Sequence, residues 1–433
     1  MGLILFVSLL FFWKILFTHQ FSIMTMSEIV NQAYSWDQFS ASTIQQGSLP
    51  LWDPFVHAGC SFVGGMQTGV FYPLKLLIYL WPFNRSHMLS PQLLQDFHVL
   101  THVLAACFLF LLARDLGLGN LPAFTASLCF SLGGFLSKVP WPDMLDGAIW
   151  LPLVLLFLIR ALRSPGAKRT TLFCCLAGLA LGMVILAGRI HIVMMDVLVV
   201  VSAVVYITMV EGGNPGASPH RQSPWVRSAG IVALIGTVAL AFGAVQLVPS
   251  VEYGRLAVRH ISAANPLPAT ERIPYSDMPD FQWPRSLFGI LFINAFPGGS
   301  IGGEGFSPYF GILPLLLTVF GVWRNWNNPW VRYLAGLAVL AFFNTLGPWS
   351  FLHGLLYVLV PYLSVDASKC PALYLSDALC HGHSGGFRTP KPVLREGTRP
   401  EGFSALLPHF DVAGNNRFPC RRYTGYLQQA RSQ

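Results

Sequence analysis

Two aspartates three residues apart have a spacing that could hold a metal ion. Asp143 and Asp146 lie in the polar stretch 140–146, between two apolar runs. Residues three apart share one face of a helix, and carboxylates are typical ligands of Mg²⁺ or Mn²⁺. Acidic residues are also favoured at a helix N-terminus by the helix dipole. Both interpretations stay open. No other cofactor is predicted, since the eight cysteines contain no CxxC spacing.

Three arginines could bind a phosphate group. Arg189, Arg255 and Arg259 lie in connections between apolar runs. The planar guanidinium group holds phosphate through paired N–H donors, and a leaving phosphate needs nearby positive charge or a metal. The alternative is that these arginines form a positive rim against lipid headgroups.

Two further polar sites interrupt apolar runs. Asp196 lies within such a run, where an acid is usually paired or functional. Arg189, two helical turns earlier, is one possible partner, and a role in a site is the other interpretation. His98 and His102 have the i, i+4 spacing of metal ligands. No third ligand lies near them in the sequence, so two interfacial histidines are the simpler interpretation.

The elements that position these residues must be membrane helices. Hydrophobic residues make up 53% of the 433 residues and charged residues 11%, with a mean hydropathy of +0.54. A soluble domain carries about a quarter charged residues. The composition excludes a soluble enzyme, a disordered protein and a nucleic-acid-binding domain, and it predicts an all-α polytopic membrane protein. The net charge of +8 fits basic cytoplasmic loops rather than a nucleic-acid surface.

Nine or ten transmembrane helices are expected, because a span needs about 20 apolar residues. The expected spans are residues 3–17, 99–112, 121–138, 147–162, 172–187, 190–209, 231–248, 309–323 and 333–349, with a weaker tenth at 351–363. The run 71–83 is short and contains two prolines and Lys75. It therefore predicts a re-entrant or interfacial segment.

Basic residues in the short loops predict the orientation. With the N-terminus in the cytoplasm, nine arginines and lysines lie in cytoplasmic loops and two in short external loops. Two long loops, 18–98 and 249–308, then face outward together with the short turns 140–146 and 188–191. Loops on a rigid scaffold usually carry binding and chemistry. The active face is therefore expected outside.

The first long loop carries the most specific motif of the chain. The run GSLPLWDPFVHAGCSF (47–62) is followed by GVFYPLKLL (69–77). An amphipathic stretch ends at Gly47, and Pro50, Trp52, Asp53 and Pro54 predict a stiff turn with an Asx-type hydrogen bond from Asp53. We expect an interfacial helix, a turn and a second interfacial helix. The plain alternative is a loop lying on the bilayer, with its aromatic residues as an interface belt.

This run resembles the first-loop signature of YfhO-like bacterial membrane proteins, which belong to the GT-C superfamily of polytopic glycosyltransferases. Three later pieces resemble family segments in the same order: GAIWLP (147–152), LAGRIH (186–191) and VQLVP (245–249). The resemblance covers about residues 1–365. It implies a GT-C-like fold with a long external first loop.

The resemblance also implies a reaction. GT-C enzymes move a sugar from a polyprenyl-phosphate-linked donor to an acceptor on the outer face of the bacterial cytoplasmic membrane. The family's catalytic acid, usually Asp, corresponds to Glu28, which would take the proton of the acceptor hydroxyl. Glu moves the charge by about one methylene, and a misplacement of that size can cost about a hundredfold in rate.

The chain changes character after Leu363. Residues 365–433 contain nine basic and five acidic residues, with many Pro, Gly and His and no periodicity. One interpretation is a disordered basic cytoplasmic tail. The other is a truncated or out-of-frame end, because YfhO-like proteins continue into further spans there. The expected domains are therefore a membrane domain at 1–364 and a tail at 365–433.

Functions from two different classes remain. One is a membrane glycosyltransferase whose partners are a lipid-linked sugar donor, a glycan or cell-envelope acceptor and membrane lipids, but no nucleic acid. The other is a transporter or flippase of lipid-linked glycans, and an inactive truncated remnant is a third outcome. Transporters bind near the bilayer midplane. The interfacial positions expected for Glu28, Asp143, Asp146 and Arg189 favour the enzyme.

Overall fold

The computed structural model describes twelve stretches of the chain, all in the first of its two compact units, 1–387 and 388–433. These stretches are residues 1–18, 22–23, 29–56, 58–133, 136–137, 141–212, 223–256, 258–259, 267–268, 275, 312–345 and 350–359. Glu28, most of the second long loop and the predicted domain boundary at 364/365 lie outside them.

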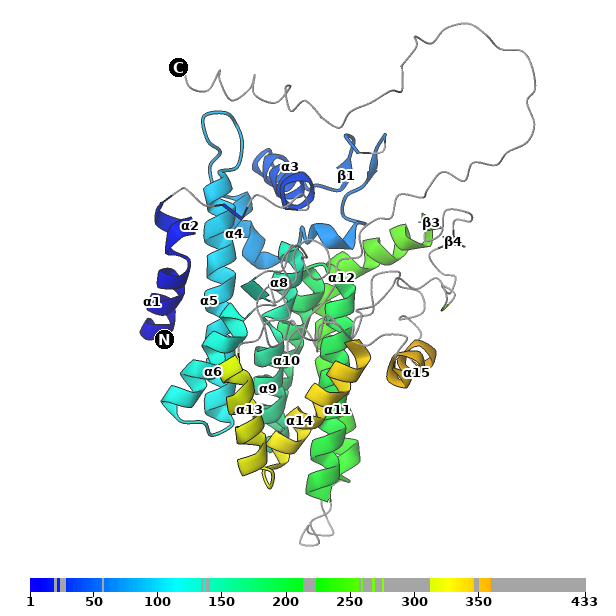
Figure 1. The fold of residues 1–433 in the computed structure, drawn as a ribbon. Helices are drawn as coiled ribbons and strands as arrows, with labels where there is room; N and C mark the ends of the chain where they lie inside the picture. Colours follow the sequence, from blue (N-terminus) through cyan, green and yellow to red (C-terminus); the bar gives the residue numbers. More distant parts are fainter. Residues whose placement is uncertain are drawn as a thin grey trace, which may run out of the picture. The chain divides into compact units, whose positions relative to one another are not determined.

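The described part is built almost wholly of helices (Figure 1). The longer helices are α1 (Gly2–Phe11), α3 (Tyr34–Gln45), α5 (Pro91–Asp115), α6 (Asn120–Leu132), α9 (Leu151–Arg163), α10 (Ala167–Leu186), α11 (Ile190–Gly212), α12 (Pro224–Leu256), α13 (Ile312–Arg324), α14 (Pro329–Thr345) and α15 (Phe351–Leu359). The shorter helices are α2 (Trp13–Phe17), η1 (Ile29–Ala33), η2 (Met66–Thr68), η3 (Pro73–Lys75), α4 (Leu76–Tyr79) and α8 (Pro142–Ala148).

Strands occur as two short antiparallel pairs in the described residues. β1 (Trp52–Asp53) pairs with β2 (Cys60–Ser61), with Trp52 opposite Ser61. β3 (Val258–Arg259) pairs with β4 (Leu267–Pro268). Neither pair is large enough to form a sheet with a core of its own.

Five helical segments are long and apolar enough to cross a membrane: α5, the α8–α9 segment Pro142–Arg163, α10, the Ile190–Val210 part of α11, and α12. α1, α6 and α13 are shorter apolar helices. The chain is therefore a helical membrane protein, as its composition predicts. The number of spans predicted from the sequence, nine or ten, is larger than these five and stays a prediction.

Glycines let the central helices approach closely. α10 packs against both α9 and α12. A Cβ added at Gly178 would lie 2.6 Å from Cβ of Val238, and one at Gly243 would lie 2.6 Å from Cγ2 of Ile185. Small residues at such crossings allow the close packing that drives helix association in lipid.

The first loop folds into a cap over one end of the helices, above α5, α8 and α10 in Figure 1. We define the cap as residues 29–89 and the end that it covers as the capped end. Two residues fasten it there. Gln246 of α12 donates a hydrogen bond from Nε2 to the Val63 carbonyl at 2.8 Å, and Tyr72 donates to the Asp146 carbonyl at 3.2 Å.

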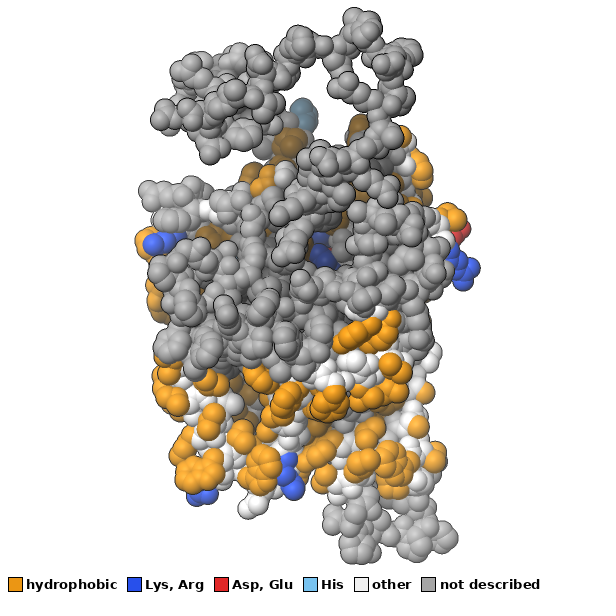
Figure 2. Space-filling model, turned by 45° about the vertical axis from the view of Figure 1, so that its right-hand side comes forward, with side chains coloured by type: hydrophobic (Ala, Val, Ile, Leu, Met, Phe, Trp, Pro, Cys, Tyr) orange, Lys and Arg blue, Asp and Glu red, His pale blue; other side chains and the backbone are white. Residues whose placement is uncertain are grey.

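Most of the arginines and lysines among the described residues lie at the opposite end of the bundle, and we call it the basic end. Arginines and lysines lie where α5, α9 and α13 end and where α10, α12 and α14 begin. They are Arg114, Arg160, Arg163, Lys168, Arg169, Arg227, Arg324 and Arg332. Figure 2 shows basic side chains at the lower edge of a surface rich in hydrophobic groups.

Helix α12 runs further than the sequence predicts. Its expected end is Val248, but the helix continues through Pro249 to Leu256. A proline inside a helix removes one backbone hydrogen bond. The extension packs against the cap, since a Cβ added at Gly64 would lie 2.5 Å from Cβ of Tyr253. This packing accounts for the continuation past the proline.

Candidate functional site

The turn of the first loop forms as predicted. The Phe55 N–H donates to Asp53 Oδ1 at 2.8 Å, which is the expected Asx-type hydrogen bond. Pro50 and Pro54 flank the Trp52–Asp53 strand, and Asp53 is buried. Phe55 is 84% exposed and Trp52 59% exposed. These aromatic side chains fit an interface belt, so the turn has a structural role.

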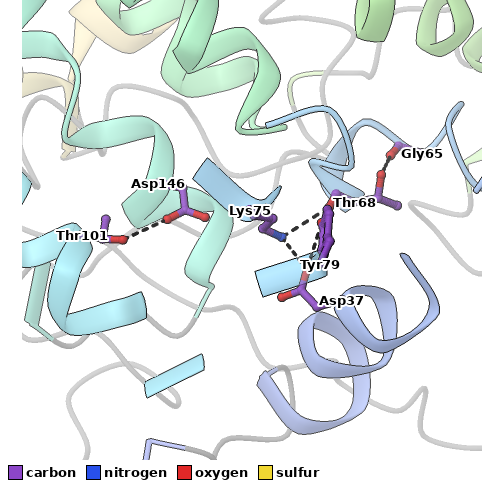
Figure 3. Close-up of polar contacts among 7 residues, drawn as sticks. All are labelled: Asp37, Gly65, Thr68, Lys75, Tyr79, Thr101 and Asp146. Atoms are coloured by element: carbon purple, nitrogen blue, oxygen red, sulfur yellow. Dashed lines mark hydrogen bonds and ion pairs between the residues drawn. The ribbon is translucent and has the colours of Figure 1, made fainter. Parts of the chain in front are cut away.

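A buried ion pair lies inside the cap. Lys75 Nζ lies 2.9 Å from Asp37 Oδ1, and the two side chains are only 5% and 6% exposed. Tyr79 donates its hydroxyl to the same Asp37 oxygen at 3.2 Å, and Lys75 also donates to the Thr68 carbonyl at 3.4 Å (Figure 3). The cap thus holds a charged lysine out of water through two oxygen acceptors, the Asp37 carboxylate and the Thr68 carbonyl.

Electrostatics fix the protonation state of this cluster. Burial alone would lower the pKa of the Lys75 ammonium group, but the adjacent Asp37 carboxylate raises that pKa above its ordinary value. Burial raises the pKa of the Tyr79 hydroxyl, an effect that Lys75 partly opposes. At neutral pH the lysine is therefore charged, and the tyrosine is a neutral hydrogen-bond donor.

Asp146 of α8 faces the same region from the membrane helices. Thr101 of α5 donates to its Oδ1 at 3.5 Å, a long hydrogen bond, and Asp146 is 2% exposed. Its other carboxylate oxygen, Oδ2, is buried and has no hydrogen-bond partner among the described residues. A buried acceptor left without a donor is costly. This oxygen is therefore available to bind an incoming donor group.

A small cavity joins the cap to the helices at this point. Asp37, Lys75 and Asp146 line it together with His98 and apolar side chains such as Ile29, and its volume is about 30 Å³. Most of the lining is apolar, but the side chains of Asp37, Lys75 and Asp146 supply polar groups. A cavity of this size can hold one water molecule, or equally a single hydroxyl group. Figure 3 shows Lys75 between Asp37 of α3 and Asp146 of α8.

Asp143 has a different partner from Asp146. Arg189 donates to both of its carboxylate oxygens, from Nη2 to Oδ1 at 3.3 Å and from Nε to Oδ2. The guanidinium group also lies over the Trp141 ring, 5.3 Å from its centroid. Asp143 stands in the first turn of α8, as the helix-start interpretation predicts. Within the described ranges, no group of three or more His, Cys, Asp or Glu side chains could hold a metal ion.

The described residues do not test whether the three predicted phosphate-binding arginines form one site. Arg189 is paired with Asp143, and Arg255 is exposed in the last turn of α12. Arg259 belongs to β3, and its side chain lies outside the description, as does the whole of Glu28. A common phosphate site therefore stays a prediction.

Asp196 and the histidines His98 and His102 are the other candidate polar residues of the apolar helices. Asp196 is 3% exposed, and its Oδ2 has no hydrogen-bond partner in the described part of the chain, since Arg189 bonds Asp143 instead. His102 lies 3.2 Å from His98 between their Nε2 atoms, and its Nδ1 lies 2.7 Å from the Ser131 carbonyl. Phe12 packs on the His102 ring. The two histidines thus form a packed pair.

Sequence reasoning missed the Asp37–Lys75–Tyr79 cluster. One signal was present, because a single lysine in the apolar run 71–83 needs a carboxylate partner if it is buried. The partner lies 38 residues earlier, in a helix whose periodicity predicts only an amphipathic segment. The pairing becomes visible only when the cap folds.

Fold and site together define a helical membrane protein with a small cavity beneath the cap of its first loop, lined by apolar side chains and three charged ones. Comparison of the chain with protein-family models, with curated proteins and with solved structures finds no match to any of them. The functional argument therefore depends on the residues themselves.

Proposed function

We propose that this chain is a membrane glycosyltransferase of GT-C type, which transfers a sugar from a polyprenyl-phosphate-linked donor to an acceptor. The observation that carries the proposal is the cavity beneath the cap. There the first loop, through Asp37 of α3 and Lys75 of the motif, meets the buried Asp146 with its unpartnered oxygen. A hydroxyl group of a sugar is the kind of donor that such an oxygen accepts.

Glu28 is the proposed catalytic base. It precedes Ile29 in the sequence, and Ile29 lines the cavity. A carboxylate within hydrogen-bond reach can take the proton of an acceptor hydroxyl as that oxygen attacks the sugar. Asp146 then accepts a hydrogen bond from the bound hydroxyl and orients it. Lys75 offsets the negative charge of Asp37, so that Asp37 adds no net negative charge to the cavity.

Positive charge for the leaving phosphate comes from Arg189, Arg255 and Arg259 in this proposal. Arg189 lies in the connection between α10 and α11 at the capped end, and it would have to share its guanidinium group between Asp143 and the phosphate. Mg²⁺ or Mn²⁺ at Asp143 and Asp146 stays a prediction. The described residues fit it poorly, because Asp143 already pairs with Arg189, and no step here depends on a metal.

The proposed setting is the bacterial cytoplasmic membrane, with the N-terminus inside and the capped end outside. The basic end would then face the cytoplasm, as the positive-inside rule requires. The full protein would have nine or ten spans. A lipid-linked sugar could enter from the bilayer beside the cap, and the acceptor from the water above it.

A transporter or flippase of lipid-linked glycans is the second candidate. One observation favours it. Asp196 has a buried carboxylate oxygen without a described partner, and this residue lies inside α11, whereas Arg189 directly precedes that helix. Transport would place binding near the bilayer midplane. The larger set of polar groups gathers at the capped end, which favours transfer chemistry.

The test is sugar transfer by the purified full-length chain in proteoliposomes. A panel of short-chain polyprenyl-phosphate hexoses serves as donor and extracted envelope glycan as acceptor. We expect product from the wild-type chain and a loss of at least about a hundredfold for Glu28→Gln. Glu252→Gln, which changes an exposed carboxylate near the same end, should retain activity.

Three outcomes would overturn the proposal. Full activity of Glu28→Gln removes the base. Equal loss in Glu252→Gln shows a general charge effect. Movement of the intact donor across the bilayer without any transfer product, abolished by Asp196→Asn, selects the transporter instead.

A further inference from the structure

A cleft lies at the basic end of the described structure, far from the cap. Its volume is about 230 Å³, and it is lined by the ends of α9 and α11 and the start of α14. Leu162, Tyr206, Val210 and Trp330 give it apolar walls. Tyr333 packs on the Tyr206 ring with 5.4 Å between ring centroids, which stiffens one wall.

Positive charge gathers around the end of α9, which forms part of the cleft lining. Arg163 lines the cleft itself. Arg160 and Arg163 both bond the single carboxylate of Asp115, at 2.8 Å and 3.5 Å. Arg227 donates to the backbone carbonyl of Ser164 at 2.6 Å, a neutral acceptor. The three arginines thus share one negative charge among their described contacts, which leaves an excess of positive charge.

We infer that this cleft binds one molecule of an anionic phospholipid, with an acyl chain between Tyr206, Val210 and Trp330 and the phosphate against Arg163 and Arg227. An apolar cleft leaves its lining without dispersion contacts unless something apolar fills it. Basic pockets between membrane helices select anionic headgroups. The inference is independent of the proposed transfer reaction, because the cleft lies at the opposite end of the bundle.

The chemistry of the cleft favours a lipid over a water-soluble ligand. Its walls offer few donors or acceptors to orient a polar molecule, while the arginines lie where α9 ends and α12 begins. A phospholipid matches both features at once, because its chain is apolar and its charged group sits at the membrane surface. Trp330 also suits that boundary, where aromatic side chains are enriched.

The test is photolabelling of the full-length chain in nanodiscs. The probe is phosphatidylglycerol with a diazirine on one acyl chain, and labelled peptides are mapped by mass spectrometry. We expect labels on the ends of α9 and α11 and the start of α14. Unlabelled phosphatidylglycerol should compete better than phosphatidylcholine with the same chains, by about fivefold for each contributing arginine, the equivalent of about 1 kcal/mol.

Two matched pairs of variants sharpen the result. Val210→Trp should fill the cleft and remove the label, whereas Val201→Trp on the same helix should not. The two valines are equally exposed, at 40% and 41%. Arg163→Gln combined with Arg227→Gln should abolish the preference for phosphatidylglycerol and keep chain labelling. Arg114→Gln, an exposed arginine at the same end, should leave the preference intact.

Either of two results would overturn the inference. Labels spread evenly over the lipid-facing helices would show that the cleft holds no particular lipid. Equal competition by phosphatidylcholine and phosphatidylglycerol would show that the arginines do not select the headgroup. If Val210→Trp does not fold, the double variant Arg163→Gln with Arg227→Gln tests the inference by itself, because those substitutions leave the apolar walls of the cleft unchanged.

Discussion

The capped end and the basic end of the bundle handle charge in opposite ways. At the capped end, Lys75 and Asp37 form an ion pair with side chains 5% and 6% exposed. At the basic end, Arg160 and Asp115 form one with side chains 42% and 16% exposed. The distances, 2.9 Å and 2.8 Å, are nearly the same. Geometry alone therefore does not distinguish the two pairs; access to water does.

This difference teaches what each pair is for. A buried pair stabilises little relative to apolar residues, but it becomes very costly when one partner is lost. An exposed pair can be broken cheaply, because water solvates both groups. The polar groups at the capped end are therefore held in one arrangement, as a catalytic or binding site requires. The exposed arginines at the basic end can exchange partners, which suits the binding of lipid headgroups.

The largest expected effect comes from breaking the buried pair. Lys75→Met leaves Asp37 charged and buried, so we expect a loss of about 3–5 kcal/mol in the free energy of unfolding. Thermal unfolding of the detergent-purified protein measures it. The double variant Lys75→Met with Asp37→Leu should recover much of the loss, because no charge is then left unpaired. A double variant as unstable as the single one would contradict the burial argument.

The next largest effect is expected at the contact between the cap and the turn that follows α10. Gly188 has φ +99, and a Cβ there would lie 2.4 Å from the Met66 carbonyl oxygen in the cap. We expect Gly188→Ala to cost about 1–2 kcal/mol for the left-handed backbone and about 1–3 kcal/mol for overpacking.

Gly117 supplies the control for this prediction at the basic end. Its φ is +94, and nothing lies within 4 Å of an added Cβ. Gly117→Ala should therefore show only the backbone effect, about 1–2 kcal/mol. The two proteins are compared by thermal unfolding and by protease cleavage within the cap. Equal losses would mean that the contact between the cap and α10 contributes nothing.

A small effect is expected from the exposed pair. Arg160→Gln should change the free energy of unfolding by only about 0.2–1 kcal/mol, because the Arg160 side chain is largely exposed and Asp115 keeps Arg163 as a partner. Added salt should reduce this difference further. A loss as large as that of Lys75→Met would remove the contrast between the two ends.

The smallest effect is the response of the buried pair to pH. The pKa of Lys75 is raised in the folded protein. Its stabilisation is therefore complete below the ordinary lysine pKa, about 10.4, and is lost only as the pH rises through the raised value. The difference in stability between wild type and Lys75→Met should therefore not fall between about pH 6 and about pH 9. A difference that falls with rising pH in that range would contradict the direction of the shift.

Much of the fold can be predicted from the sequence, because lipid imposes a simple rule on length and hydropathy. The expected spans 172–187 and 190–209 correspond closely to α10 and α11. The Asx turn at Asp53 also follows from local chemistry alone. Local patterns fail at α12, where contacts with the cap carry the helix past Pro249.

The site is less predictable, because its residues come from distant parts of the chain. Asp143 and Asp146 form one pair in the sequence, but the fold gives them separate partners, Arg189 and Thr101. Lys75 and Asp37 look unrelated in the sequence and meet in the structure. Long-range packing decides both pairings, and the spacing of residues along the sequence does not predict such packing.

Sugar transfer by Asp146→Asn tests the central claim most directly, because Asp146 offers the unpartnered oxygen in the capped cavity. The assay compares this variant with wild type and with Arg160→Gln at the basic end, in proteoliposomes with matched protein content. Asp146→Asn replaces one carboxylate oxygen by an amide NH₂ group, which cannot accept the hydrogen bond that orients the hydroxyl. The account therefore predicts a loss of about a hundredfold for this variant and near wild-type transfer for Arg160→Gln. Undiminished transfer by a folded Asp146→Asn protein would contradict it, because the cavity beneath the cap would then not be the reaction site.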